Sequence, residues 1–377
     1  SRVVTAATCT LPGLKGFTCS CGDHYSEPIE ALGHRYENGV CQTCGAKESS
    51  GDVVDNTYYL FGSINGNNYA YDYDNIGNRE TAQEAAEAAT SYESNQLNQY
   101  TAIGDFEPTY DDAGNQTKVK TSTGIWSVVY NAENRPTSFT NTASGTIVEC
   151  TYDYMGRRAT KKVTINGSVT LHQRYLYRGY LQIACCDLTR SNHPCLWLIT
   201  WDPSQPVATR PLAIQKDGTW YTYGWDLTKN ICEVYGQHGY IRTNYTYSPY
   251  GEVTISGDVT QPIQWSSEYS DSELDLVYYN YRHYSPVDGR WLQRDFIHEY
   301  PNNQNAYIFV KNSAPFVSDF LGLIECSEDD KRIAKLAIEA DEKDPLKGYE
   351  GITEFGGSLP VVGKVQWSLT SIVIDKA

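Results

Sequence analysis

Hydrophobic and polar residues alternate along this chain in short runs, and turn-forming residues separate the runs. β-branched residues alternate with lysine over residues 117–120 (Thr-Lys-Val-Lys), and a similar run follows over residues 159–163 (Ala-Thr-Lys-Lys-Val). Alternation with a period of two is typical of a strand that buries one face. The pattern predicts a chain of short antiparallel β-strands.

One motif, Tyr-Asp-x-x-Gly followed by a polar residue, marks the turns between these runs. It occurs at residues 73–78, 110–115 and 152–157, and degenerate copies begin at Tyr92 and Tyr130. The five tyrosines are separated by 19, 18, 20 and 22 residues, which is the length of two strands and two turns. Tyrosine suits a half-buried strand, aspartate caps a type I turn, and the glycine adopts the left-handed conformation that closes a hairpin. The spacing predicts an all-β array of hairpins.

The array is expected to continue beyond these repeats. Residues 217–220 (Asp-Gly-Thr-Trp), 223–226 (Tyr-Gly-Trp-Asp) and 247–252 (Tyr-Ser-Pro-Tyr-Gly-Glu) have the composition of further hairpins. The Ala- and Glu-rich stretch at residues 80–90 departs from the pattern and predicts a helical turn or a decorated loop. Because a single hairpin is only marginally stable, neighbouring hairpins are expected to stack on one another.

Composition and charge narrow the classes of function. The 31 tyrosines and 30 glycines favour strands and tight turns. A formal net charge of -16 argues against a nucleic-acid partner, because counterion release needs clustered lysine and arginine. No apolar run approaches the roughly 18 residues of a membrane span. The sequence also lacks a phosphate loop, a nucleophile elbow and a dinucleotide fingerprint.

The tyrosine repeats resemble the YD repeats of RHS proteins, of teneurins and of the C components of insecticidal toxin complexes. In those families the strands wind into a spiral sheet that encloses a hollow shell. The resemblance implies that residues 58–267 form part of such a shell. This chain would then be the closing end of the shell.

Residues 268–323, which we term the core-terminal segment, are similar to the segment that ends the core of RHS proteins. Several motifs in fixed order carry the resemblance: a strand at 278–284 (Tyr-Tyr-Asn-Tyr-Arg-His-Tyr), a turn at 286–290 (Pro-Val-Asp-Gly-Arg), a strand at 291–295 (Trp-Leu-Gln-Arg-Asp), then Asn305-Ala306-Tyr307 and residues 312–315 (Asn-Ser-Ala-Pro). Residues 319–323 (Asp-Phe-Leu-Gly-Leu) match the terminal Asp-Pro-x-Gly-Leu of that family.

In relatives that process themselves, this segment is an aspartate-dependent autoprotease that cuts after the terminal leucine. The resemblance implies that the bond between Leu323 and Ile324 is cut, with Asp295 and Asp319 as the carboxyl pair. Such chemistry needs one protonated and one ionised carboxyl group, which a low-dielectric cavity provides. Arg294 is the candidate for holding a carboxylate ionised or stabilising the oxyanion.

The sequence departs from the family at two positions near these aspartates. Phe296 and Phe320 stand where proline usually follows each aspartate, and proline would fix the local backbone. A purely structural role therefore stays open, in which both aspartates cap turns of a closing plug.

Residues 324–377 correspond to the variable C-terminal tail, which in this family is often a toxin held inside the shell. Residues 329–341 have the periodicity of an amphipathic helix, and residues 356–365 suggest a loop and a strand. The tail has no histidine and one cysteine, Cys326, so neither a metal nuclease nor a Cys-His hydrolase can be assembled from it alone. We expect a truncated toxin, a pretoxin linker or a relic.

Five of the 11 cysteines lie in the first 44 residues. Two turn-like corners, Cys19-x-Cys21-Gly and Cys41-x-x-Cys44-Gly, predict a zinc-ribbon-like module over residues 1–46 with four thiolates around structural zinc, and His34 is an alternative ligand. Disulfide bonding in an oxidising compartment remains the alternative. The module resembles small cysteine repeats of bacterial surface proteins, and residues 47–57 form a polar linker.

A second group of cysteines lies further along the chain. Cys185 and Cys186 are followed by His193, Cys195 and Cys232, but the spacing does not match a metal-binding corner. We interpret these cysteines as buried core residues with an occasional disulfide.

Two classes of function follow. The resemblance implies a scaffold that encapsulates and delivers a bacterial polymorphic toxin, secreted or at the cell surface, with its own tail as cargo and an upstream shell and secretion apparatus as partners. The alternative is a non-catalytic adhesion or glycan-binding protein that recognises a target-cell surface glycan or protein, since repeat arrays often serve as binding surfaces. An exposed aromatic face would favour the alternative.

Overall fold

The computed structural model describes residues 67–84, 86–203, 210–295, 305–314 and 319, and also the strand backbone within residues 2–41 and 58–64. The chain divides into two units, Ser1–Thr57 and Tyr58–Ala377. Each unit is described by itself.

The first unit contains two small antiparallel sheets. The three-stranded sheet has the order β1 (Arg2–Thr5), β2 (Gly13–Thr18), β3 (His24–Ile29), and β4 (Tyr36–Glu37) pairs with β5 (Val40–Cys41). Cys41 ends β5. The other predicted zinc ligands, Cys19, Cys21, Cys44 and His34, lie outside the described residues, so the zinc site stays a prediction.

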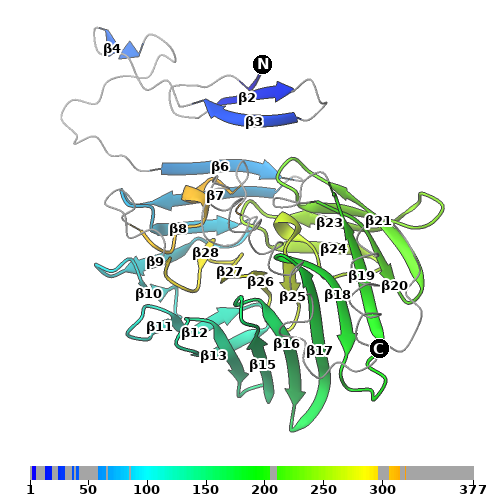
Figure 1. The fold of residues 1–377 in the computed structure, drawn as a ribbon. Helices are drawn as coiled ribbons and strands as arrows, with labels where there is room; N and C mark the ends of the chain where they lie inside the picture. The colour runs from blue at the N-terminus through cyan, green and yellow to red at the C-terminus, as the bar shows by residue number, and fades with distance from the viewer. Residues whose placement is uncertain are drawn as a thin grey trace. The chain divides into compact units, whose positions relative to one another are not determined.

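The second unit is built almost entirely from antiparallel hairpins (Figure 1). A five-stranded sheet has the order β10-β9-β8-β7-β6, with β6 Tyr58–Ile64, β7 Asn67–Tyr73, β8 Arg79–Glu84, β9 Thr90–Ser94 and β10 Tyr100–Ile103. A fourteen-stranded sheet follows in sequence order: β11 Thr109–Tyr110, β12 Gln116–Thr121, β13 Gly124–Tyr130, β14 Pro136–Asn141, β15 Thr146–Tyr152, β16 Arg158–Ile165, β17 Ser168–Arg178, β18 Leu181–Asp187, β19 Cys195–Trp201, β20 Pro211–Lys216, β21 Thr219–Trp225, β22 Ile231–Tyr235, β23 Ile241–Tyr247 and β24 Val253–Gly257. Each strand pairs with its sequence neighbours, which confirms the predicted hairpin array.

The repeat motif forms the turns as its residue types predict. After β7, the amide of Gly77 donates to the carbonyl of Asp74 (3.0 Å), and the amide of Asn78 donates to Oδ1 of Asp74 (2.7 Å). Gly77 has φ +80°, a conformation that glycine adopts without strain. In the two degenerate copies Asn98 and Asn134 take this position at φ +61° and +56°, and asparagine tolerates it better than other residues with a side chain.

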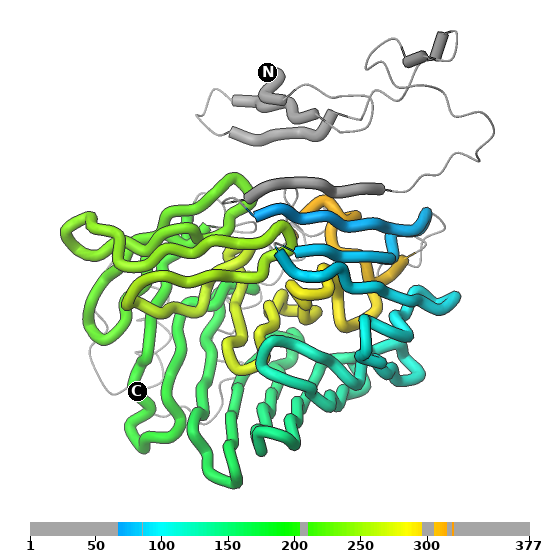
Figure 2. The backbone as a smooth tube through the Cα atoms, turned by 180° about the vertical axis from the view of Figure 1, so that it is seen from behind, coloured from blue at the N-terminus to red at the C-terminus, as the bar shows by residue number. Residues whose placement is uncertain are grey.

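The core-terminal segment forms a third, four-stranded sheet. It consists of β25 Tyr269–Asp271, β26 Leu276–Tyr279, β27 Arg282–Ser285 and β28 Arg290–Trp291, and the 3-10 turns Trp265–Ser267 and Val310–Asn312 flank it. Both backbone views show these strands in the middle of the unit, with the hairpins of the two larger sheets around them (Figures 1 and 2).

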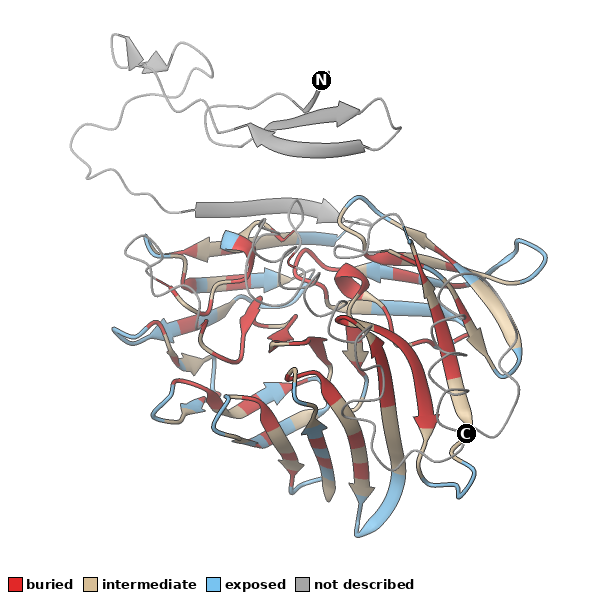
Figure 3. Cartoon of the chain, viewed as in Figure 1, coloured by how far each residue is buried: buried red, intermediate tan, exposed pale blue. Residues whose placement is uncertain are grey.

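The described residues of the second unit form three hydrophobic cores, and each of them includes residues of this inner segment. Tyr269 and Tyr278 belong to the core of β17–β23, Tyr279 and Trp291 pack with the tyrosines of β7–β10, and Leu276 packs with β12–β16. Burial concentrates on the strand positions that face the inner sheet (Figure 3). The inner sheet therefore serves as a shared core for hairpins that are distant in sequence.

Two local predictions were wrong, and a third holds only in its loop alternative. At residues 80–90 no helical turn forms, because β8 continues to Glu84 in register with β7, residues 86–89 form a non-helical connection and β9 starts at Thr90; tertiary pairing overrides the helix propensity of alanine and glutamate. Residues 278–284 are not one strand but a tight hairpin, and Asn280 at φ +57° permits the turn between β26 and β27. The strand expected at 291–295 ends at Trp291. After it, the amide of Leu292 donates to His283 and the amide of Asp295 donates to Ala306, so the segment does not pair with one neighbouring strand.

Candidate functional site

The core-terminal segment brings two of the predicted catalytic residues onto one buried arginine. Nη2 of Arg282 lies 3.0 Å from Oδ2 of Asp295 and 3.9 Å from Oδ2 of Asp319. All three side chains are at most 5% exposed. β27 supplies Arg282, and β28 supplies Trp291, whose ring centroid lies 4.1 Å from the guanidinium carbon. A stacked guanidinium is fixed in orientation and keeps its donors for the carboxylates.

Hydrogen bonds to three separate elements position the backbone that leads to Asp295. The amide of Leu292 donates to the carbonyl of His283 (3.0 Å), the carbonyl of Leu292 accepts from the amide of Gln116 (2.9 Å), and the amide of Asp295 donates to Ala306 (3.0 Å). The segment is thus held between β27, β12 and residues 305–307. These bonds fix Asp295 on its N-terminal side, whereas Phe296 and Phe320 lie outside the described residues.

Arg294, the cation predicted from sequence, has neighbours on the repeat turns and on residues 305–307. Its Cδ is 3.4 Å from the position that a Cβ on Gly114 would occupy, and its charge acts on Tyr307. Each of the two aspartates has an ion pair with Arg282. Sequence reasoning missed Arg282 because it sits inside a tyrosine-rich strand pattern that looks structural. The predicted cleavage residues, Leu323 and Ile324, lie outside the described residues.

The charge of Asp319 acts on a third carboxyl group, that of Glu268. Burial, and then this negative charge, raise the pKa of Glu268 well above its usual range. Burial also lowers the pKa of Arg282, and the two aspartates oppose that effect. General acid–base hydrolysis needs one protonated and one ionised carboxyl group, and a raised pKa favours the protonated form of Glu268.

Glu268 also borders a small cavity of about 20 Å³. Ser266, Tyr278 and Asn280 contribute polar atoms to its lining. A volume of this size holds about one water molecule, and the polar lining suits it. Among the described residues no group of three His, Cys, Asp or Glu side chains is arranged to hold a metal ion.

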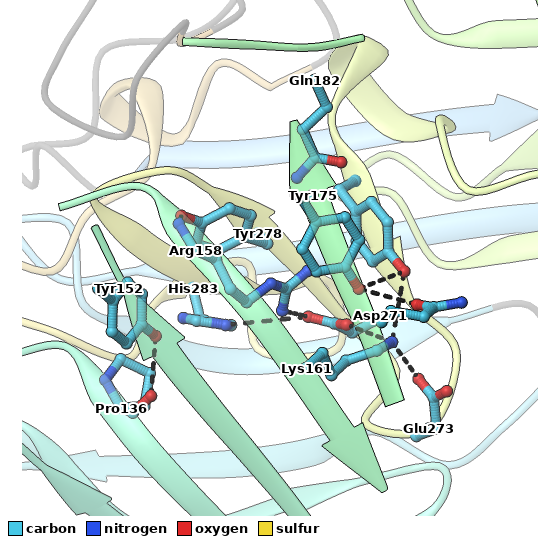
Figure 4. Close-up of polar contacts among 12 residues, drawn as sticks. Pro136, Tyr152, Arg158, Lys161, Tyr175, Gln182, Asp271, Glu273, Tyr278 and His283 are labelled. Carbon is cyan, nitrogen blue, oxygen red and sulfur yellow. Dashed lines mark hydrogen bonds and ion pairs between the residues drawn. The ribbon is translucent and has the colours of Figure 1, made fainter. Parts of the chain in front are cut away.

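A second buried polar cluster joins the core-terminal segment to the repeats (Figure 4). Nη1 of Arg158 lies 2.6 Å from Oδ2 of Asp271, and Nζ of Lys161 lies 3.0 Å from Oδ1 of Asp271 and 2.7 Å from Oε2 of Glu273. Nε2 of His283 lies 3.9 Å from Asp271. Arg158, Lys161, Asp271 and His283 are at most 2% exposed.

Opposite charges face one another in this cluster. Burial alone would raise the pKa of Asp271, but Arg158 and Lys161 hold it well below its usual range. Burial lowers the pKa of His283 to about 3, so the ring is neutral at pH 7. The guanidinium carbon of Arg158 lies 4.3 Å from the ring centroid of Tyr278. We interpret the cluster as an anchor between β16 and β25.

Other buried arginines anchor the inner sheet to the repeat turns in the same way. Nη1 of Arg79 donates to the carbonyl of Val287 (2.9 Å), and Nη2 of Arg290 donates to the carbonyl of Asn98 (2.7 Å). The arginines lie against tyrosine rings; the guanidinium carbon of Arg290, for example, is 3.9 Å from the ring centroid of Tyr100. These contacts tie the inner sheet to the repeat turns.

A wound wall of antiparallel tyrosine-rich hairpins around an inner four-stranded sheet defines a YD-repeat shell protein. The chain belongs to the Teneurin YD-shell family, whose model matches residues 55–315.

Relatives of known name share part of the chain. The tRNA3(Ser)-specific nuclease WapA of Bacillus spizizenii is 25% identical over 233 residues, and the tRNA nuclease WapA of Bacillus subtilis is 26% identical over 239 residues. Each match covers 60% of this chain and 9% of the relative, so the chain spans less than a tenth of their length.

Solved structures with the same fold include those of Tc toxins. The crystal structure of TcdB2-TccC3-TEV matches with a TM-score of 0.55 and 19% identity over 83% of this chain, and a Photorhabdus luminescens Tc holotoxin pore matches with 0.55 and 16% over 86%. This chain corresponds to 17% of each of those chains. At this identity the likeness establishes the fold.

Proposed function

We propose that this chain is the closing end of a toxin-encapsulating RHS shell and that it cuts its own C-terminal tail after Leu323. The observation that carries the proposal is the convergence of Asp295 and Asp319 on the buried guanidinium of Arg282. Relatives named as nucleases and the likeness to Tc toxin structures support a toxin as cargo.

The proposed cut is a hydrolysis of the peptide bond between Leu323 and Ile324. One aspartate of the Asp295–Asp319 pair is ionised and takes a proton from water as the water oxygen attacks the Leu323 carbonyl carbon. The other aspartate of the pair is protonated and donates its proton to the leaving nitrogen of Ile324. Arg282 offsets the negative charge that develops on the carbonyl oxygen. The products are a carboxyl group on Leu323 and an amino group on Ile324, and the water supplies the atoms that both ends gain.

The distribution of aromatic side chains supports a shell over an adhesive surface. The repeat tyrosines Tyr73 and Tyr92 are at most 8% exposed and pack with residues of the inner sheet, and Tyr110, Tyr130 and Tyr152 are half-buried. In the described part of the chain, the large hydrophobic residues that are exposed include only two aromatic ones, Tyr154 and Tyr240. A glycan-binding face would instead expose its aromatic rings for stacking.

The proposal includes delivery outside the producing cell, in competition between bacteria. The upstream shell, a secretion apparatus and the tail as cargo are the proposed partners. Across the described ranges, no helix is both long and apolar enough to span a bilayer.

The test is to express the chain with a C-terminal tag and measure the masses of the products. We expect the wild-type chain to be cut after Leu323 and Asp295→Asn and Asp319→Asn to stay intact. Asp258→Asn is the matched control, because Asp258 is exposed and pairs with the surface residue Arg242; it should be cut like the wild type. Equal cutting in all variants would refute the assignment of the aspartates.

A further inference from the structure

Two cysteines face each other across neighbouring strands of the fourteen-stranded sheet. Cys186 lies near the end of β18, Cys195 begins β19, and the two are direct partners in the antiparallel register. Figure 1 shows these strands side by side. Facing residues of an antiparallel pair have Cα atoms about 4.5–5.5 Å apart, and a disulfide needs about 4.4–6.8 Å. The backbone register alone therefore brings the pair within bonding range.

A β-bulge creates this pairing. The register shifts between Cys185 and Cys186, so Trp197 faces Cys185 while Cys195 faces Cys186, and Leu196 is the extra residue. Without the bulge, Leu196 would stand opposite Cys186. The connecting loop is closed by a hydrogen bond from the amide of Asp187 to the carbonyl of residue 194 (2.9 Å). The end of the hairpin is thus already fixed in the geometry that the pairing needs.

A third cysteine, Cys185, directly precedes Cys186 on β18. Cys185 and Trp197 form a cross-strand row in the hydrophobic core, at 0% and 6% exposure. Arg174, Cys186 and Cys195 form the next row of cross-strand partners. Cys186 is 3% exposed and belongs to the same hydrophobic core, whereas Cys195, which packs against that core, and Arg174 are half-buried.

The surroundings favour thiols over thiolates in the folded chain. Burial, and then the neighbouring Cys195, raise the pKa of Cys186 to about 12, against the opposing charge of Arg174. Burial raises the pKa of Cys195 to about 11. Because thiolates are the reactive form, spontaneous oxidation of the folded chain is slow and benefits from an exchange catalyst or from oxidation during folding.

We propose that Cys186 and Cys195 form a cross-strand disulfide in an oxidising compartment and that this bond staples the β18–β19 hairpin. The oxidant is a disulfide such as oxidised glutathione. One cysteine attacks it to give a mixed disulfide and one reduced glutathione, and the second cysteine displaces the other glutathione. The two thiols lose two electrons and two protons, and the oxidant gains them. This proposal is independent of the self-cleavage proposal.

Peptide mapping tests the proposal directly. The full chain is refolded with oxidised glutathione, remaining thiols are alkylated, and trypsin then cuts after Arg190, which lies between the two cysteines. We expect the peptides that contain Cys186 and Cys195 to stay linked and to separate on reduction. Fragmentation of the linked peptides in the mass spectrometer should show that Cys186, and not Cys185, carries the link. Alkylated Cys186 and Cys195 in the oxidised chain, or a linkage of Cys195 to Cys185, would overturn the proposal.

Matched variants separate the staple from general effects of oxidation. Cys195→Ser replaces a half-buried side chain and should abolish the linkage, while Cys232→Ser, at a similarly half-buried site, should keep it. Oxidation should raise the thermal midpoint by about 5 °C in the wild type and in Cys232→Ser but not in Cys195→Ser. The same rise in all three chains would show that the pair is not the stabilising link.

Discussion

Replacing Asp271 by asparagine removes the one charge that both Arg158 and Lys161 share. The substitution keeps the volume of the side chain, so the change is electrostatic. Arg158 would lose its partner at 2.6 Å, while Lys161 would keep Glu273 at 2.7 Å. Both cations would remain fully buried.

The expected cost follows from these contacts. Breaking a buried ion pair by removing one partner costs about 3–5 kcal/mol, because the remaining charge stays desolvated. The Tyr278 ring beside Arg158 and the carboxylate beside Lys161 lessen that cost. We therefore expect Asp271→Asn to lower the free energy of unfolding by about 3–4 kcal/mol.

The assay is urea unfolding at pH 7, followed by tryptophan fluorescence. The control is Glu149→Gln, which breaks the pair between Lys162 and Glu149; those side chains are 35% and 48% exposed, so the change should cost less than about 1 kcal/mol. Adding Lys161→Met to Asp271→Asn should recover part of the loss by removing an unpaired charge. If Asp271→Asn unfolds within about 1 kcal/mol of the wild type, the anchor does not stabilise the shell.

Three further predictions concern titration and metal binding. The pKa of His283 falls to about 3 in the folded chain, below the usual value of about 6.5, so the free energy of unfolding decreases as the pH falls from 6.5 toward 3. His283→Gln should make this decrease smaller between pH 6.5 and 5, as measured by unfolding curves. An unchanged dependence on pH would contradict the assignment. Burial and the neighbouring Glu84 raise the pKa of Glu252 to about 9, so the folded chain keeps this proton where the unfolded chain loses it, and stability decreases as the pH rises from about 4.5 to 9. Glu252→Gln should raise the thermal midpoint at pH 8 and not at pH 4. Equal shifts at both pH values would contradict this prediction. The cysteine module should bind about one zinc ion per chain, measured by elemental analysis, and Cys41→Ser with Cys44→Ser should release it, while full retention would exclude the thiolate site.

The repeat could be predicted because its information is local. Asp74 and Gly77 form a turn with each other whatever lies around them, and the tyrosine before them needs only a buried face. The alternation of residues therefore predicted the hairpins, their spacing and their all-β class. Where local preference and pairing disagree, as at residues 80–90, the pairing with β7 decides.

The site could be predicted only in part because its contacts are not local. Asp295 and Asp319 were found through motif order, whereas Arg282 and Glu268 join them through folding of the inner hairpin. The anchor is even less visible, since Arg158 and Asp271 are 113 residues apart in sequence. The spacing of such residues in the sequence does not predict that they meet, because only the folded shell brings them together around the core-terminal segment.

The most direct test of the central claim is the mass of the N-terminal product made in water enriched in oxygen-18. Self-cleavage by water predicts a chain that ends at Leu323 and gains about 2 Da from one heavy oxygen in its new carboxyl group. The same experiment with Asp295→Asn should yield only the full-length chain. A wild-type product that ends elsewhere, or an intact wild-type chain, would contradict the account.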